Sequence, residues 1–231
     1  MENISNMENV FSGREMSIHE LALEGDFQAV KQKIQLKPEL VTKTDESGRI
    51  PLHWAVSKGH KEMVGWLLDL NKDANPADDS KWTPLIIAAS AGHVDVARML
   101  IDNGADVSAV TDQGRSALLY AASKNRDEMV RLLLSSGADI NKQDALGASP
   151  LHRAAGPGHT AVVKLLLAAN NMDPNITDRY GNTPLHYACE EERLEVAKLL
   201  IHAGASVEVQ NKQEHTPLQM CGPGFARSFK N

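Results

Sequence analysis

The sequence predicts an all-α solenoid, in which short helical repeats stack in one row, and three observations favour this fold. One leucine recurs six times among the 231 residues, with steps of 33, 33, 33, 34 and 33 residues. A short string of the type Thr-Pro-Leu-His surrounds most of these leucines. Each of the first five leucines lies in one apolar stretch of helical length, and a second such stretch follows it. The six leucines are Leu52, Leu85, Leu118, Leu151, Leu185 and Leu218.

The string predicts how the first helix of each repeat begins. A serine or threonine accepts a backbone N–H at the helix start, and proline fits the first helical turn. The leucine then enters the core. A small residue follows three positions later and lets neighbouring helices approach closely. These small residues are Ala55, Ala88, Ala121, Ala154, Ala188 and Cys221.

A glycine or asparagine ends this first helix in most repeats, because both residues tolerate the left-handed conformation found after helices. The positions are Gly59, Gly92, Asn125 and Gly158, whereas Glu192 stands there in the fifth unit. A second helix with a leucine-rich end follows, and then a turn such as 103–106. The single 34-residue step reflects one extra residue within 170–174.

The period, the order of elements and the Thr-Pro-Leu-His-x-Ala string resemble the ankyrin repeat. The resemblance implies an all-α ankyrin-repeat solenoid of about seven repeats with β-turn or hairpin tips. We expect a disordered N-terminal tail over residues 1–15 and an ankyrin-repeat domain over 16–231. Within it we expect a degenerate N-cap repeat over 16–47, repeats that start near 48, 81, 114, 147 and 181, and a C-cap repeat from 214.

Composition narrows the class of protein. The chain has 24 basic and 30 acidic residues, a net charge of −6, which is a poor match for nucleic acid or anionic lipid. No apolar run approaches the ~20 residues of a membrane span, and the N-terminus lacks the regions of a signal peptide. Two cysteines make no disulfide framework. We therefore expect a soluble intracellular protein without nucleic-acid or membrane partners.

Histidine and cysteine are the residues that could suggest chemistry. The repeat accounts for six of the nine histidines: His53, His60, His93, His152, His159 and His186. Equivalent positions in stacked repeats lie ~10 Å apart, too far to share one metal ion. Cys189 and Cys221 occupy small core positions. We expect no metal, no cofactor and no enzymatic activity; a melting temperature unchanged by a chelator would weigh against a metal-dependent module.

The residues that the repeat leaves free form three registers on one face, which the ankyrin architecture makes concave. The first register follows the turn glycine, the second lies on the first helix, and the third lies one turn further on. Aromatic residues, arginine and charge are typical of protein-binding patches. The partner-binding candidates are Arg49, Trp54, Asp79, Trp82, Ile87, Ser90, Arg115, Tyr120, Ser123, Lys124, Tyr187, Glu190 and Glu191.

Several strings are more specific than the ankyrin consensus. Residues 52–55, 82–85, 120–126, 181–186, 189–193 and 216–219 resemble the gankyrin family, over about residues 17–220. The resemblance implies a chaperone that binds the C-terminal domain of an AAA ATPase subunit during assembly of the proteasome regulatory particle. Matched by position, Arg49, Asp79, Lys124 and Glu191 are charges that would engage this domain, with Trp54, Trp82, Ile87 and Ser90 beside them.

The resemblance further implies kinase or ubiquitin-ligase partners and a cytoplasmic and nuclear location, and we expect a monomer. The family's Leu-x-Cys-x-Glu string for retinoblastoma-protein binding differs here, because Tyr187 replaces leucine and Cys189 falls in a helix. We therefore expect no retinoblastoma binding. The alternative function is an ankyrin-repeat inhibitor or adaptor of a kinase or transcription factor.

Overall fold

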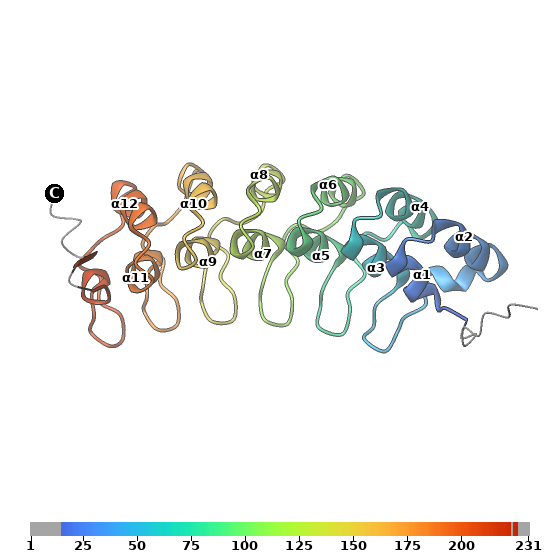
Figure 1. Ribbon diagram of the computed structural model, residues 1–231, viewed down its shortest axis with the longest axis horizontal. Helices are drawn as coiled ribbons and strands as arrows, with labels where there is room; N and C mark the ends of the chain where they lie inside the picture. The colour runs from blue at the N-terminus through green and yellow to red at the C-terminus, as the bar shows by residue number, and fades with distance from the viewer. Residues whose placement is uncertain (1–14, 223, 226–231) are drawn as a thin grey trace, which may run out of the picture.

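The computed structural model describes residues 15–222 and 224–225, and within this part the chain forms two parallel rows of short helices (Figure 1). The odd-numbered helices make an inner row next to the long loops, and the even-numbered helices make an outer row (Figure 1). The inner helices are α1 (Ile18–Glu24), α3 (Pro51–Lys58), α5 (Pro84–Ala91), α7 (Ala117–Ser123), α9 (Pro150–Ala155) and α11 (Pro184–Glu190). The outer helices are α2 (Phe27–Leu36), α4 (Lys61–Asn71), α6 (Val94–Asp102), α8 (Asp127–Ser135), α10 (Thr160–Leu167) and α12 (Leu194–His202).

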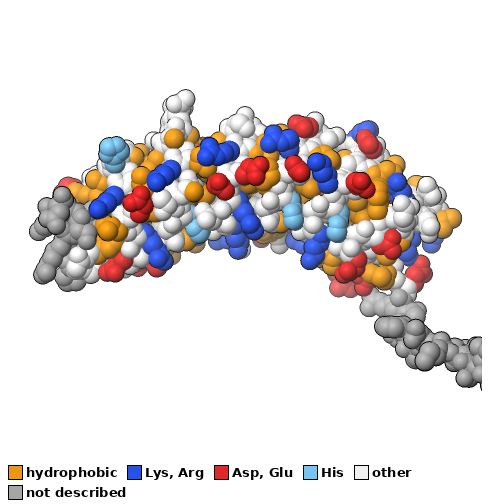
Figure 2. Space-filling view, turned by 45° about the horizontal axis from the view of Figure 1, so that its top comes forward, with side chains coloured by type: hydrophobic (Ala, Val, Ile, Leu, Met, Phe, Trp, Pro, Cys, Tyr) orange, Lys and Arg blue, Asp and Glu red, His pale blue; other side chains and the backbone are white. Residues whose placement is uncertain are grey.

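Each inner helix and the outer helix that follows it make one repeat, numbered 1 to 6 from the N-terminus. Two 3-10 helices, η1 (Pro38–Thr42) and η2 (Pro217–Gln219), complete the described elements, and η2 stands at the start of a seventh repeat. Each inner helix contacts the inner helices of the repeats on either side and the outer helix of its own repeat. The whole row bows into an arc (Figure 2).

The inner helices begin and end as the sequence predicts. The hydroxyl groups of Thr83, Ser116 and Ser149 accept the backbone N–H three residues later, at 3.3–3.4 Å. Gly92 follows α5 with φ of 89°, a left-handed conformation that glycine adopts without steric cost. Glu192 takes the same role after α11 with φ of 51°.

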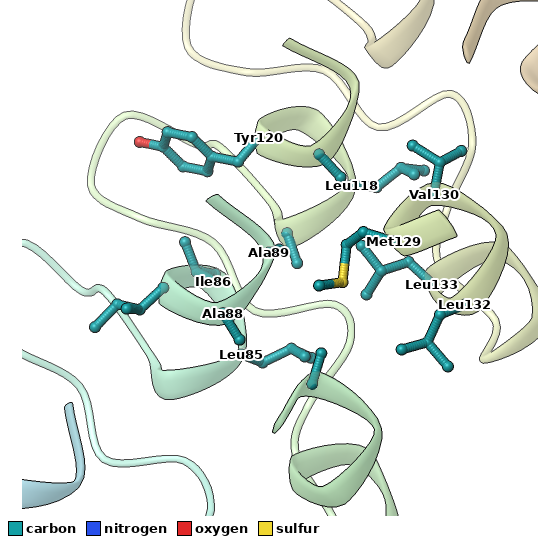
Figure 3. Packing of buried hydrophobic residues seen from close by; sticks show 14 of the residues in the cluster. Leu85, Ile86, Ala88, Ala89, Leu118, Tyr120, Met129, Val130, Leu132 and Leu133 are labelled. Atoms are coloured by element: carbon teal, nitrogen blue, oxygen red, sulfur yellow. The ribbon is translucent and has the colours of Figure 1, made fainter. Parts of the chain in front are cut away.

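One continuous apolar core runs between the two rows. The small residues predicted between neighbouring inner helices, Ala55, Ala88, Ala121, Ala154 and Ala188, are all fully buried. Figure 3 shows Leu85, Ala88 and Ala89 of α5 beside Leu118 of α7 and Met129 of α8. The first five repeat leucines are buried and Leu218 is partly buried, so the repeat period sets the core.

Backbone hydrogen bonds link each loop to the loop before it. The amide of Asp79 donates to the carbonyl of Ser47 at 3.0 Å, and later loops repeat this bond, as in Arg179 to Leu146 at 2.9 Å. A Cβ on Gly147 would lie 2.8 Å from the Arg179 nitrogen, so this close approach requires glycine. The loop before α7 also holds an antiparallel bridge between Val110 and Ser116.

The prediction of an all-α repeat solenoid is confirmed. Within the described ranges there is no strand, and no helix is long and apolar enough to cross a membrane. The predicted N-terminal tail lies outside the described residues except for Glu15, as does most of the chain after residue 222. The repeat boundaries stay predictions.

Candidate protein-binding surface

The turns before α3, α5, α7, α9, α11 and η2 are each organised by one acidic or polar side chain. The first carboxylate oxygen of Asp78 accepts the backbone N–H groups of Ser80 and Trp82, at 3.0 and 2.8 Å. Asp45, Asp144 and Asp178 make the same pair of bonds, and Asn211 does so with its amide oxygen. These two bonds shape the turn and leave the second carboxylate oxygen free for a side chain of the inner face.

The inner face comprises the exposed sides of the inner helices and of the loops that precede them, the side predicted to be concave. Several candidate binding residues of this face are bound to the turn carboxylates. The Trp54 indole donates to Asp45 and the Tyr187 hydroxyl donates to Asp178, at 2.9 and 2.7 Å. These side chains therefore hold the face in shape as well as lining it.

Arg49 connects two loops. Its Nε donates at 2.9 Å to Asp78 of the following loop, whose side chain is only 4% exposed. Its guanidinium also lies 5.1 Å from the centre of the Trp54 ring. Because Asp78 neutralises Arg49, this arginine contributes less free positive charge than the sequence suggests.

Hydrogen bonds determine the charge of the turn carboxylates. Burial alone would raise the pKa of Asp45, but hydrogen bonds from the backbone of Arg49 and Ser47 and from the Ser47 and Trp54 side chains lower it to about 2. Burial and then the bond to Asp178 raise the pKa of the Tyr187 hydroxyl. Asp45 is therefore an anion and Tyr187 is a neutral donor near neutral pH.

Aromatic side chains cover the centre of the inner face. The Trp82 and Tyr120 rings lie 4.5 Å apart, and this contact leaves only 9% of Tyr120 exposed. Ile87 is buried at 6% exposed, and Ser90 at the end of α5 is half-buried. Ile87 and Tyr120 thus offer edges rather than whole side chains to a partner. Figure 3 shows the Tyr120 hydroxyl pointing away from the labelled core.

Charged candidates lie exposed at the rims of the inner face. Asp79 lies at a loop tip, Lys124 follows α7, and Glu190 ends α11; none of the three side chains forms a hydrogen bond or ion pair with the described residues. Glu191 lies 3.7 Å from Arg193, an exposed pair of the kind that contributes little to stability. These charges are therefore accessible to a partner.

A hollow of about 400 Å³ brings together candidates from two repeats. Its lining includes Ser123, Tyr187 and Glu191. It also includes Arg153 and Arg193, which sequence reasoning did not select as site residues. Arg153 stands two residues after its repeat leucine, as Trp54 and Tyr187 do, so its position was a usable signal. Arg193 had no such signal, because its hydrogen bond to the Gly156 carbonyl, 3.1 Å long, depends on how the repeats stack.

Asp144 binds arginines from two repeats. Arg153 of its own repeat hydrogen-bonds to it with two guanidinium nitrogens, whereas the Nε of Arg115 lies 3.6 Å away. Burial would raise the pKa of Asp144, but the bonds from Arg153 and from the backbone lower it. Asp144 was not selected from the sequence, although an aspartate recurs four residues before the first register at 45, 78, 144 and 178.

The six repeat histidines have the structural roles that the sequence predicts. Nδ1 of His53, His152 and His186 accepts a backbone N–H of its own helix start, and Nε2 reaches a carbonyl of the next loop at 2.9–3.1 Å. His60, His93 and His159 bond to carbonyls of the preceding repeat at 3.0–3.1 Å. Burial lowers the pKa of the first three, which are neutral near pH 7.

Residues 15–222 and 224–225 contain no group of three histidine, cysteine or acidic side chains that could hold a metal ion. Cys189 is fully buried, and burial followed by the nearby Cys221 raises its pKa to about 12. A thiol with this pKa does not act as a nucleophile at neutral pH. The surface offers shape and charge for binding, and the expected absence of catalysis stays a prediction.

Comparison with known proteins agrees with the repeat architecture. The human 26S proteasome non-ATPase regulatory subunit 10 is 44% identical over 60 residues, 26% of each chain. The probable 26S proteasome regulatory subunit p28 of Saccharomyces cerevisiae (strain ATCC 204508 / S288c) is 36% identical over 58 residues, 25% of each chain. The matched segment thus spans only about a quarter of these relatives.

The likeness to a solved structure extends over nearly the whole chain. The ankyrin repeat domain of Bcl-3, described as a unique member of the IkappaB protein family, superposes with a TM-score of 0.80 at 25% identity and covers 94% of this chain and 98% of that one. A family model for ankyrin repeats (three copies) matches residues 18–111, 77–144 and 118–211. The chain belongs to the ankyrin-repeat family.

Proposed function

We propose that the protein is a non-catalytic chaperone in assembly of the proteasome regulatory particle, which binds the C-terminal domain of an AAA ATPase subunit on its inner face. The observation that carries this proposal is the similarity to proteasome regulatory subunits of human and yeast. A binding scaffold is what a rigid ankyrin solenoid provides, since stacked repeats create an extended surface.

The inner face supports this proposal by its charge order. Lys124 is exposed at the end of α7, and Glu190 and Glu191 are exposed at the end of α11, two repeats further on. A partner that spans the face would therefore present acidic residues to repeat 4 and basic residues to repeat 6. Rigid docking of this kind would mask the ATPase surface until the partner assembles further, in the cytoplasm and nucleus.

A second function, inhibitor or adaptor of a kinase or transcription factor, is favoured by the similarity to the Bcl-3 ankyrin domain along nearly the entire chain. Kinase or ubiquitin-ligase partners, implied by the gankyrin-like strings, belong to the same interaction class. The Bcl-3 likeness reflects the backbone shape that all such solenoids share, whereas the proteasome relatives have higher sequence identity within the matched segment.

Calorimetric titration of the purified chain with isolated proteasomal ATPase C-terminal domains tests the proposal. We expect one domain to bind one copy of the chain, and the others to bind more weakly or not at all. A kinase domain and a transcription-factor dimerisation domain serve as comparison ligands. Binding to one of these, with no binding to any ATPase domain, would contradict the chaperone function and favour the adaptor.

A further inference from the structure

The arginines of the inner face differ in how well the protein itself neutralises them. Arg49 has a carboxylate of its own, because its Nε donates at 2.9 Å to Asp78. Asp144, in contrast, is shared by Arg115 and Arg153. Two guanidinium groups thus face a single carboxylate, which leaves one net positive charge at the junction of repeats 4 and 5.

The surplus charge belongs to Arg115. Arg153 takes the Asp144 hydrogen bonds, while the Arg115 Nε lies 3.6 Å from that carboxylate, beyond hydrogen-bonding distance. The Arg115 guanidinium makes no hydrogen bond within residues 15–222 and 224–225, although it carries five donors. Asp112 of the same loop is exposed and forms no ion pair with it in the described part of the chain.

The surroundings of Arg115 keep it in place and accessible. Its guanidinium lies 5.9 Å from the centre of the Tyr120 ring, and the Trp82 ring packs against Tyr120 with its centre 4.5 Å away. The Arg115 side chain remains 33% exposed, whereas Asp144 beneath it is 1% exposed. Lys124, at the other end of α7, adds a second accessible positive charge to the same repeat.

We propose that Arg115 receives the side-chain carboxylate of an aspartate or glutamate on the surface of the docked partner. A planar guanidinium binds a carboxylate through two parallel hydrogen bonds, and this match confers direction as well as charge. A phosphate of nucleic acid fits less well, because the chain as a whole carries a net charge of −6. The inference rests on the proposed function only in that the partner occupies the inner face.

A side chain of a folded partner suits this position better than a chain terminus. Arg115 lies in repeat 4, with three repeats of inner helices before it and two after it. A partner that lies along the face therefore crosses Arg115 with the middle of its surface. The edge of Tyr120 beside the guanidinium, and the Trp82 ring that packs against Tyr120, would contact apolar atoms beside that carboxylate.

The first test is a titration of Arg115→Gln with the ATPase C-terminal domain that binds the unaltered chain. We expect about tenfold weaker binding, the effect of one charge-assisted hydrogen-bonded contact. The matched control is Arg131→Gln, which removes the same charge from the same repeat at an exposed position of the outer helix α8. Both variants should melt like the unaltered chain, because Asp144 keeps its bonds to Arg153.

A double-mutant cycle identifies the carboxylate. Arg115→Gln is combined with single Glu→Gln and Asp→Asn variants of the domain, and one of these should remove most of the Arg115 effect. Equal affinity of Arg115→Gln and the unaltered chain, or additive effects with every domain variant, would overturn the inference while leaving the proposed function intact.

A second test needs no partner protein, so it tests carboxylate binding by Arg115 even if no ATPase domain binds the chain. The arginine Nε–H resonances of isotope-labelled full chain are followed while acetate replaces chloride at constant ionic strength. We expect the Arg115 resonance to shift in a saturable way and the Arg131 resonance to stay. Equal shifts of both, or none at Arg115, would overturn the inference.

Discussion

The repeats in the middle of the solenoid and those toward its ends are held together by different interactions. Toward the ends, His53, His152 and His186 each join an inner helix to the next loop by hydrogen bonds. In the middle, Ile86 and Leu119 occupy the same helical position, and each is 1% exposed. The same backbone therefore forms with either a polar link or an apolar contact at this position.

One turn of the middle region, the turn before α7, also differs from the other turns. Asp45, Asp78, Asp144 and Asp178 each accept two backbone N–H groups, while the Thr111 hydroxyl before α7 accepts only the amide N–H of Arg115, at 3.3 Å. Buried leucines and alanines are common to both regions, so packing determines the fold and polar links are local additions. In the repeat that lacks these bonds, the side chains of Arg115 and Tyr120 make no hydrogen bonds within the described residues, and the partly exposed Arg115 is accessible to a partner.

The largest expected effect tests the buried leucines, which the middle repeats and the end repeats share. Leu151 of α9 and Leu118 of α7 are buried, at 0% and 1% exposed. We expect Leu151→Ala and Leu118→Ala each to lower the free energy of unfolding by roughly 2–5 kcal/mol, the range for a buried leucine. Urea unfolding measures both, and a loss below about 1 kcal/mol for Leu151→Ala would mean that this repeat register is wrong.

The second prediction concerns pH and the histidine links. Burial lowers the pKa of His53, His152 and His186 in the folded state, so the unfolded chain, with a histidine pKa near 6.5, binds protons first as pH falls. The histidine contribution to stability is therefore complete above about pH 7.5 and falls as the pH drops through 6.5, by at most about 1.4 kcal/mol per pH unit and histidine. Thermal unfolding at a series of pH values measures the slope.

The control for this prediction replaces one of these histidines by leucine, the residue found at the same position in the middle of the solenoid. His152→Leu copies Leu119 and removes one of three titrating groups, so the slope should fall by about a third. Asp45, with a pKa of about 2, affects stability only in more acidic solution. An unchanged slope in His152→Leu would show that the histidine links do not cause the pH dependence.

The smallest expected effect comes from placing an aspartate, with its hydrogen bonds, in the turn before α7. Tyr120 stands nine residues after Thr111, as Tyr187 stands nine residues after Asp178. Thr111→Asp should therefore gain turn bonds and a bond from the Tyr120 hydroxyl, and raise the unfolding free energy by about 1 kcal/mol. Thr111→Asp combined with Tyr120→Phe should lose part of this gain. A destabilised Thr111→Asp would show that burial of the carboxylate outweighs the new bonds.

The repeating parts of the structure could be predicted from the sequence because they depend on local spacing. The positions of Pro-Leu-His strings and helix-ending glycines give the inner helices, the small residues between them and the roles of six histidines. The turn aspartates recur with the same period and could have been recognised as well. Their pairing with Arg49 or Arg153 could be recognised only from the stacked structure.

The candidate site was less predictable from the sequence, because its ion pairs depend on how the repeats stack. The sequence placed Arg49 and Arg115 in one register as equivalent charges. The structure distinguishes them, because Asp78 binds Arg49 directly while Arg153 outcompetes Arg115 for Asp144. Likewise the exposure of Trp82 and Tyr120 depends on the contact between their rings, which lie in neighbouring repeats.

The central claim is that a partner docks on the inner face and contacts its middle and its C-terminal end at once. Lys124 and Glu191 directly follow inner helices α7 and α11, roughly 20 Å apart at ~10 Å per repeat. This exceeds the Debye length of about 8 Å at physiological salt, so the two charges act independently.

The most direct measurement is therefore a binding titration of Lys124→Glu, Glu191→Lys and the double variant against the ATPase C-terminal domain. We predict that each reversal weakens binding and that the two losses of binding free energy add within about 0.5 kcal/mol. Affinity that stays unchanged in both single variants, while the domain still binds, would contradict docking on the inner face.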